Sequence, residues 1–277
     1  YLPGLTPEET NKFHLLPGEP LFRAAQMILR GRTEELFKTA LFNLRPATQD
    51  RPYFFSFFRP ATLGLISTSQ GHRLLPVTEW GLLFIWGGLG SILLLAGAGI
   101  FLPLLKIKPR PRGLVYFGLI GLGYMLAEMT LLAETIYQLG RPALAIPLVI
   151  GLFLVISGLG SLLWGGRPPK AFALASAAAL PLTLLALRHL PVGPLTVGLT
   201  LAPAALLMGV PFAGGLVHLA GSWPQARAWA FGINGFFSVI GSLTATLICL
   251  QAGHLVAVAL AGGCYLLAGL EYRRIKS

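Results

Sequence analysis

Charged residues are scarce in this sequence. Only 11% of the 277 residues are charged, Asp50 is the single aspartate, and the mean hydropathy reaches +0.72. A soluble domain carries about 25% charged residues. The scarcity argues against an ordinary water-soluble globular domain and predicts an all-α, polytopic membrane protein.

Cysteine is also rare, and residues typical of catalytic or metal sites are few. Cys249 and Cys264 both fall in apolar segments, where they are typical of small core residues. No spacing of Cys, His and carboxylate residues typical of zinc or haem ligation occurs. No glycine-rich cofactor loop follows a predicted strand. We therefore predict no catalytic residue, no cofactor site and no metal site in this chain.

Long apolar runs dominate the sequence from Trp80 onward. A helix of about 20 apolar residues crosses the ~30 Å hydrocarbon core of a bilayer. Residues 1–79 are expected to form a partly helical extramembrane segment, and residues 271–277 form a basic tail. The bundle between them, residues 80–270, is expected to contain about seven spans, near 80–105, 113–137, 143–165, 171–190, 195–219, 228–250 and 254–270.

The net charge of +11 has two interpretations, nucleic acid or the anionic surface of a membrane. Short basic loops of a membrane protein face the cytoplasm, so we predict a lipid bilayer as partner and no nucleic acid. One side holds ten basic residues and the other only three. The C-terminus is therefore expected in the cytoplasm and residues 1–79 outside it. The ten are Lys106, Lys108, Arg110, Arg112, Arg167, Lys170, Arg227, Arg273, Arg274 and Lys276; the three are Arg73, Arg141 and Arg188.

Short helices are predicted within the extramembrane segment. Thr6 has the pattern of an N-cap, the stretch 20–30 has helical apolar spacing and ends at Gly31, and a further helix is expected from Thr33 to about Leu41. The segment is too small to be predicted as an independent domain.

The stretch RPATQDRPYFFSFF follows these helices. Arg45, Asp50, Arg51 and Tyr53 within it are predicted to form an interfacial clasp, in which the charges pair locally and the aromatic rings settle at the membrane interface. An alternative is that Asp50 is a catalytic base or a cation ligand.

Four stretches carry a resemblance to a known family: YLPGLTPEETNKF, RPATQDRPYFFSFF, FGLIGLGYMLAEMTLL and AWAFGINGFFSVIGS. Together they resemble the C-terminal membrane region of bacterial spermidine-synthase-like, or S-adenosylmethionine-dependent methyltransferase-like, integral membrane proteins. The resemblance implies a multi-pass protein of the bacterial inner membrane. It also implies that any enzymatic domain would lie upstream of Tyr1. In this family an acid pair commonly precedes Arg-Pro-Tyr-Phe, whereas here Gln49 replaces the first acid and Asp50 retains the second.

Polar residues inside the spans are the candidates for function, because an ionisable group at bilayer depth costs ~2.5–3.5 kcal/mol or more. Glu128 lies in the middle of a span, on the same helix face as Tyr124. Glu134 lies on a different face and nearer the interface. Asn234 is expected to bond across a small-residue helix interface. Glu128 is either a proton or cation site or a protonated acid bonded between helices, and its pairing with Asn234 is a hypothesis.

Two functions from different classes follow. In the first, the chain is a membrane-embedded anchor or scaffold, or an accessory subunit of a membrane complex, held by a protein partner or an upstream domain. In the alternative, it is a transporter or a proton- or cation-conducting protein that uses Glu128, with Glu134 and Asn234 in support.

Overall fold

The computed structural model describes residues 20–40, 42–53, 56, 59, 80–106, 113–219 and 226–272. The chain divides into two compact units, Tyr1–Leu83 and Phe84–Ser277. The helix predicted at Thr6 lies outside the described residues.

Among the described residues, seven helices are long and apolar enough to cross a membrane, which confirms the predicted fold class. Each predicted span begins and ends within two residues of one of them. The first consists of α5 (Trp80–Ser91), a π-helical turn (Ile92–Ala96) and α6 (Gly97–Lys106). The other six are α7 (Leu114–Leu139), α8 (Pro142–Trp164), α9 (Pro169–His189), α10 (Pro194–Leu219), α11 (Ala226–Gln251) and α12 (His254–Glu271).

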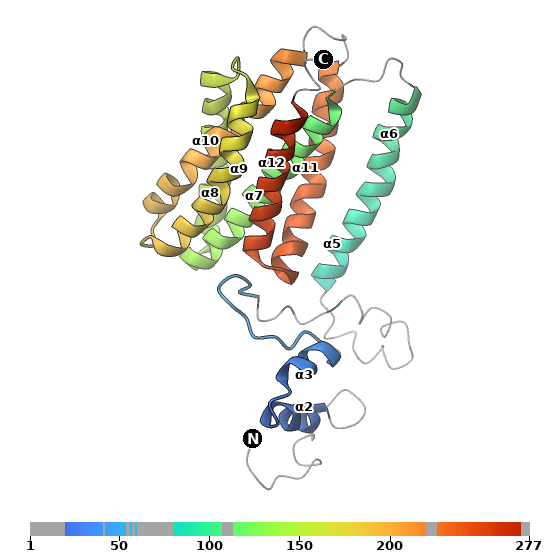
Figure 1. The fold of residues 1–277 in the computed structure, drawn as a ribbon, viewed down its shortest axis with the longest axis vertical. Helices are drawn as coiled ribbons and strands as arrows, with labels where there is room; N and C mark the ends of the chain where they lie inside the picture. The colour runs from blue at the N-terminus through green and yellow to red at the C-terminus, as the bar shows by residue number, and fades with distance from the viewer. Residues whose placement is uncertain are drawn as a thin grey trace. The chain divides into compact units, whose positions relative to one another are not determined.

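Helix α7 is the centre of the bundle. It packs against α8, α9, α10, α11 and α12, as Figure 1 shows. Its glycines allow this close approach. A Cβ at Gly121 would collide with the carbonyl oxygen of Asn234 on α11, and a Cβ at Gly123 would lie 2.9 Å from the Cβ of Cys264 on α12. Glycine therefore sets how closely α11 and α12 lie against α7.

Helices α8 and α10 form a second close pair. Gly160 of α8 lies against the carbonyl of Leu206, and Gly209 of α10 lies against the carbonyl of Ser157, with no room for a Cβ at either glycine. The Ser161 hydroxyl donates a hydrogen bond of 2.6 Å to the carbonyl of Gly209. Small residues on both helices thus bring the two backbones into contact.

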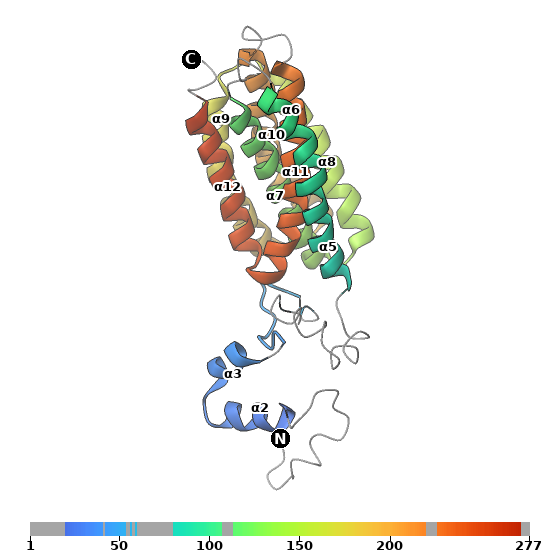
Figure 2. The ribbon, with the colours of Figure 1, turned by 90° about the vertical axis from the view of Figure 1, so that its right-hand side faces the viewer.

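The first span lies at the edge of the bundle (Figures 1 and 2). It touches α11, where Gly97 faces the ring of Phe236 and Phe101 meets the same ring edge-on, with 5.7 Å between ring centroids. Only 6% of its most apolar stretch is buried, against 61% for α7. Most of its surface is therefore left for lipid.

Among its described residues, the first unit contains two short helices, α2 (Pro20–Leu29) and α3 (Thr33–Thr39). Gly31 separates them and has a φ of +72°, the left-handed conformation that commonly ends a helix. The Arg59 guanidinium donates to the carbonyls of Phe37, Lys38 and Ala40. Arg59 thus satisfies carbonyls that the end of α3 leaves without helical partners.

Candidate functional site: buried polar residues along helix α7

A buried ionic group joins three helices at one end of the bundle. We call it the Glu134 cluster; its members are Glu134 and Gln138 of α7, Arg188 of α9 and His254 of α12. Arg188 donates to both carboxylate oxygens of Glu134, through Nε at 3.2 Å and through Nη2 at 2.9 Å. His254 Nδ1 lies 2.6 Å from Oε2, and Gln138 Nε2 donates to Oε1 at 2.9 Å. Both carboxylate oxygens therefore have partners.

The Glu134 cluster is almost completely shielded. The side chains of Glu134 and His254 are 0% exposed, and that of Arg188 is 9% exposed. Bonds between a guanidinium and a carboxylate are roughly twice as strong as bonds between neutral groups. Burial of two opposite charges is tolerated only when each finds its partner. The contacts therefore fix α7, α9 and α12 relative to one another.

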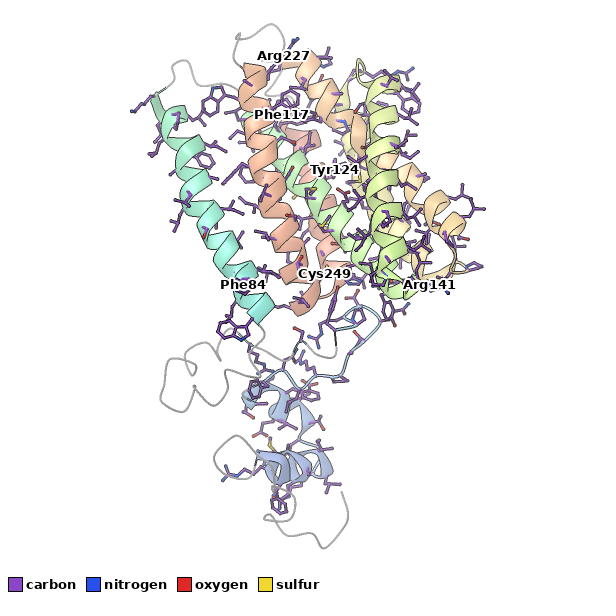
Figure 3. The ribbon with its side chains drawn as sticks, turned by 180° about the vertical axis from the view of Figure 1, so that it is seen from behind. Phe84, Phe117, Tyr124, Arg141, Arg227 and Cys249 are labelled. Carbon is purple, nitrogen blue, oxygen red and sulfur yellow. The ribbon has the colours of Figure 1, made fainter. Side chains whose placement is uncertain are left out.

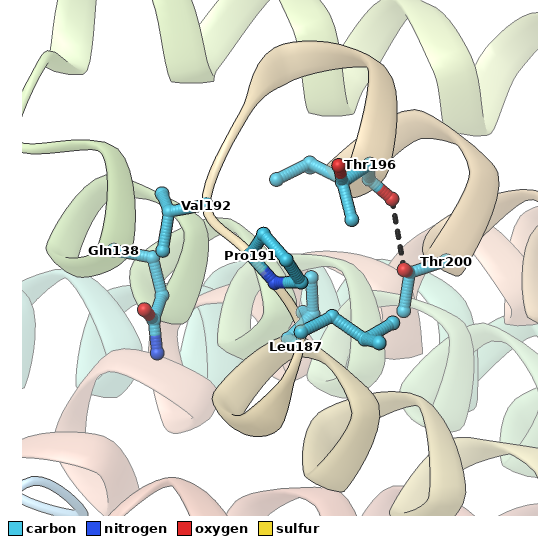
Figure 4. Close-up of a pocket in the computed structure, with 8 residues that line it drawn as sticks. Gln138, Leu187, Pro191, Val192, Thr196 and Thr200 are labelled. Carbon is cyan, nitrogen blue, oxygen red and sulfur yellow. Dashed lines mark hydrogen bonds between the residues drawn. The ribbon is translucent and has the colours of Figure 1, made fainter.

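The positions of the members place the Glu134 cluster near a membrane surface. Arg188 is the second-last residue of α9 and His254 is the first of α12. A small cavity of about 10 Å³ adjoins Gln138, between Leu187, Pro191 and Thr196 (Figure 4). A single water molecule needs about 10–15 Å³. The cavity is thus about large enough for one water molecule beside Gln138. The carboxylate of Glu134 is itself fully buried.

The sequence identifies Glu134 as a candidate but not its partners. It places Arg188 among the loop residues that set orientation, and His254 near a span end at the membrane interface. The available signal was that both fall at predicted span ends on the side nearer to Glu134. Arg141, which the sequence placed on that same side, lies at the opposite end of the bundle from Arg227 in Figure 3.

Glu128 occupies a different environment in the middle of α7. Its side chain is 6% exposed, and Glu134 follows six residues later, about 9 Å along the helix. The Tyr124 hydroxyl lies 3.2 Å from the Ser157 hydroxyl of α8; Figure 3 shows Tyr124 between the two ends of the bundle. The Tyr265 hydroxyl of α12 is buried and has no hydrogen-bond partner within the described part of the chain.

Asn234 connects α11 to the other half of α7. Its amide donates to the carbonyl of Phe117 at 3.1 Å, and Ser238 donates to the carbonyl of Gly121 at 3.3 Å. Phe117 precedes Glu128 by eleven residues, about 16 Å along the helix. Asn234 thus bonds to backbone at a distance from Glu128.

The predicted clasp contains a local turn. The amide of Arg51 donates to the Thr48 hydroxyl at 3.2 Å, and the backbones of the two residues bond to each other. Arg45 pairs with Glu34 of α3 at 3.5 Å, and both side chains are about half exposed or more. Asp50 and Tyr53 lie in or next to this turn, whereas Phe54, Phe55, Phe57 and Phe58 lie outside the described residues.

Among the residues that the structure describes, no group of three His, Cys, Asp or Glu side chains could hold a metal ion. Within the described bundle, Glu134 forms an ion pair with Arg188, and Glu128 is a second buried carboxyl group. Comparison with models of known protein families, with curated proteins and with solved structures finds no match to this chain.

Proposed function

We propose that the chain is a membrane-embedded scaffold, either the anchor region of a spermidine-synthase-like polytopic protein or an accessory subunit of a membrane complex. The observation that carries this proposal is the Glu134 cluster. A carboxylate whose oxygens are both occupied by Arg188, His254 and Gln138 is suited to holding helices together rather than to exchanging ligands.

The glycine contacts support the same function. Helices α7 and α11, and helices α8 and α10, lie so close together that the glycines between them have no space for a Cβ. Protein interiors packed in this way behave as rigid, weakly compressible bodies. A rigid bundle is a suitable base for the extramembrane segment 1–79 and for whatever protein is joined to it.

The scaffold predicts an assembly and no conduction. Extraction of native membranes in mild detergent should yield the chain in an assembly with a second polypeptide or as part of a longer one, with a mass above 29.6 kDa in native mass spectrometry. Purified protein in proteoliposomes should leave the decay of an imposed pH gradient the same as in empty vesicles. A lone 29.6 kDa chain that dissipates the gradient would overturn the scaffold.

A second candidate function is proton or cation conduction through Glu128. The observation in its favour is a buried carboxyl in mid-membrane, together with the Tyr265 hydroxyl on the neighbouring helix α12, which has no hydrogen-bond partner among the described residues. Ionisable residues at this depth mark proton and ion pathways in many transporters.

Conduction predicts that the flux depends on Glu128. Glu128→Gln should abolish the flux and leave the melting temperature unchanged, because glutamine keeps the shape of a protonated acid. Thr246→Ala, at an exposed position of α11 whose hydroxyl bonds within its own helix, is the matched control and should keep the flux. Conduction is contradicted if wild-type vesicles carry no flux under any pH or sodium gradient.

A further inference from the structure

An apolar groove lies between the first span, α7 and α11, on the side of the bundle where the first span packs against α11. Its volume is about 270 Å³, close to the ~300 Å³ lower end of small-molecule pockets. Phe101 and Leu104 line it from α6, Val115 and Leu119 from α7, and Ile233 and Phe237 from α11. All six side chains are apolar, so the groove suits a hydrocarbon occupant.

The floor of the groove is a close contact between α7 and α11. Gly118 lies against the ring of Phe237, and a Cβ there would come within 2.9 Å of it. Val115 on the wall is 63% exposed and Phe101 is 42% exposed. The groove is therefore a fixed surface depression that faces outward from the bundle, where the bilayer lies.

The length of the groove along α7 is close to the thickness of the hydrocarbon layer of one leaflet. Along α7 the lining runs from Leu114, the first residue of the helix, to Leu122. Eight residues of helix cover about 12 Å, and half of a ~30 Å hydrocarbon core is about 15 Å. The groove thus extends from one membrane surface almost to the midplane, as the acyl chain of a lipid in that leaflet does.

The charge at the mouth of the groove indicates the headgroup. Lys106 ends α6 two residues beyond Leu104, and Arg227 is the second residue of α11, six residues before Ile233. Both side chains are exposed. The described helix ends and loops on this side also carry Arg167 and Lys170, against the single acid Glu271. Basic residues at a membrane surface attract anionic lipid.

We propose that this groove is a binding site for one anionic phospholipid, with an acyl chain against Val115 and Phe237 and its phosphate between Lys106 and Arg227. The site requires neither the scaffold function nor conduction through Glu128. A bound lipid would fill the space between the first span and α7, where protein contact is sparse.

The protein is reconstituted in vesicles of phosphatidylglycerol or of phosphatidylcholine, with identical acyl chains in the two lipids. It is then extracted in detergent, and native mass spectrometry counts the lipid molecules that it retains. Wild type should retain one phosphatidylglycerol and little phosphatidylcholine. Val115→Trp, which fills the groove, should abolish retention. Leu162→Trp, on the exposed face of α8 in the same leaflet, should retain the lipid as wild type does. Equal retention by Val115→Trp and wild type would overturn the site.

The charges are tested separately from the groove. Each basic residue near an anionic surface contributes about five-fold in affinity, so Lys106→Gln with Arg227→Gln should weaken phosphatidylglycerol retention roughly 30-fold. Arg141→Gln, at the other end of the bundle, should have no effect. Equal retention of both lipids by wild type would overturn the headgroup assignment. A dimer that Val115→Trp dissociates would instead identify a second copy of the chain as the occupant.

Leu104→Trp provides a second way of filling the groove from α6, should Val115→Trp lower the melting temperature. It should also abolish phosphatidylglycerol retention. Retention by a folded Leu104→Trp variant would contradict the proposal.

Discussion

The first span and α7 show two ways of being a membrane helix. The first span is the more apolar of the two, yet only 6% of its most apolar stretch is buried, whereas 61% of the corresponding stretch of α7 is buried. In a water-soluble protein the more apolar helix would be the more buried one, because water drives apolar surface into the interior. Between helices in lipid that driving force is absent, and packing and polar contacts decide which helix lies inside.

Small residues alone do not place a helix in the core. Gly81, Gly87, Gly88 and Gly90 of the first span have nothing within 4 Å of where a Cβ would stand, while the glycines of α7 at 118, 121 and 123 meet other helices. The difference is that α7 combines its glycines with buried polar groups, among them Glu134, which has partners on α9 and α12. The comparison therefore predicts where substitution is tolerated.

The largest effect is expected from breaking the Glu134 cluster. Arg188→Ala leaves a buried carboxylate without its main partner and should lower the free energy of unfolding by about 3–5 kcal/mol. Denaturant unfolding in detergent micelles would measure it. Arg141→Ala, an exposed arginine at the same end of the bundle, is the control and should change the value by less than about 0.5 kcal/mol. Equal losses in the two variants would show that the cluster does not hold α7 in place.

A smaller loss is expected from overfilling the contact between α7 and α11. Gly121→Ala places a methyl group against the Asn234 carbonyl and should cost about 1–3 kcal/mol. Gly88→Ala in the first span meets open space and should leave the free energy of unfolding unchanged or slightly raised. Melting temperatures of the pair give the direct comparison, and a destabilising Gly88→Ala would mean that the first span is packed as tightly as α7.

The smallest effect is expected at Asn234. Its single bond to the Phe117 carbonyl resembles interhelical bonds that contribute about 0.6 kcal/mol on average. Asn234→Ala should lower the free energy of unfolding by about that amount. A double-mutant cycle with Ser238→Ala would separate this bond from the neighbouring one to Gly121. A loss as large as that of Arg188→Ala would assign Asn234 a role beyond packing.

The sequence predicted the fold because about 20 apolar residues in a row have few alternatives to a spanning helix. It also identified Glu128, Glu134 and Asn234 as the polar positions to examine. The sequence did not pair Glu134 with Arg188 and His254, because these follow at separations of 54 and 120 residues and only their places at predicted span ends relate them to Glu134. The sequence likewise did not predict that the first span lies at the edge of the bundle, because the first span and α7 are both rich in glycine.

The long separation between Glu134 and His254 also has a consequence for how the protein is made. A chain grows at about 5–20 residues per second, so His254 is synthesised roughly 6–24 s after Glu134. When α7 is complete, Gln138 is the one final partner of Glu134 already made, because Arg188 follows 54 residues after Glu134 and His254 120 residues after it. Helix α12 therefore completes a cluster that α7 began.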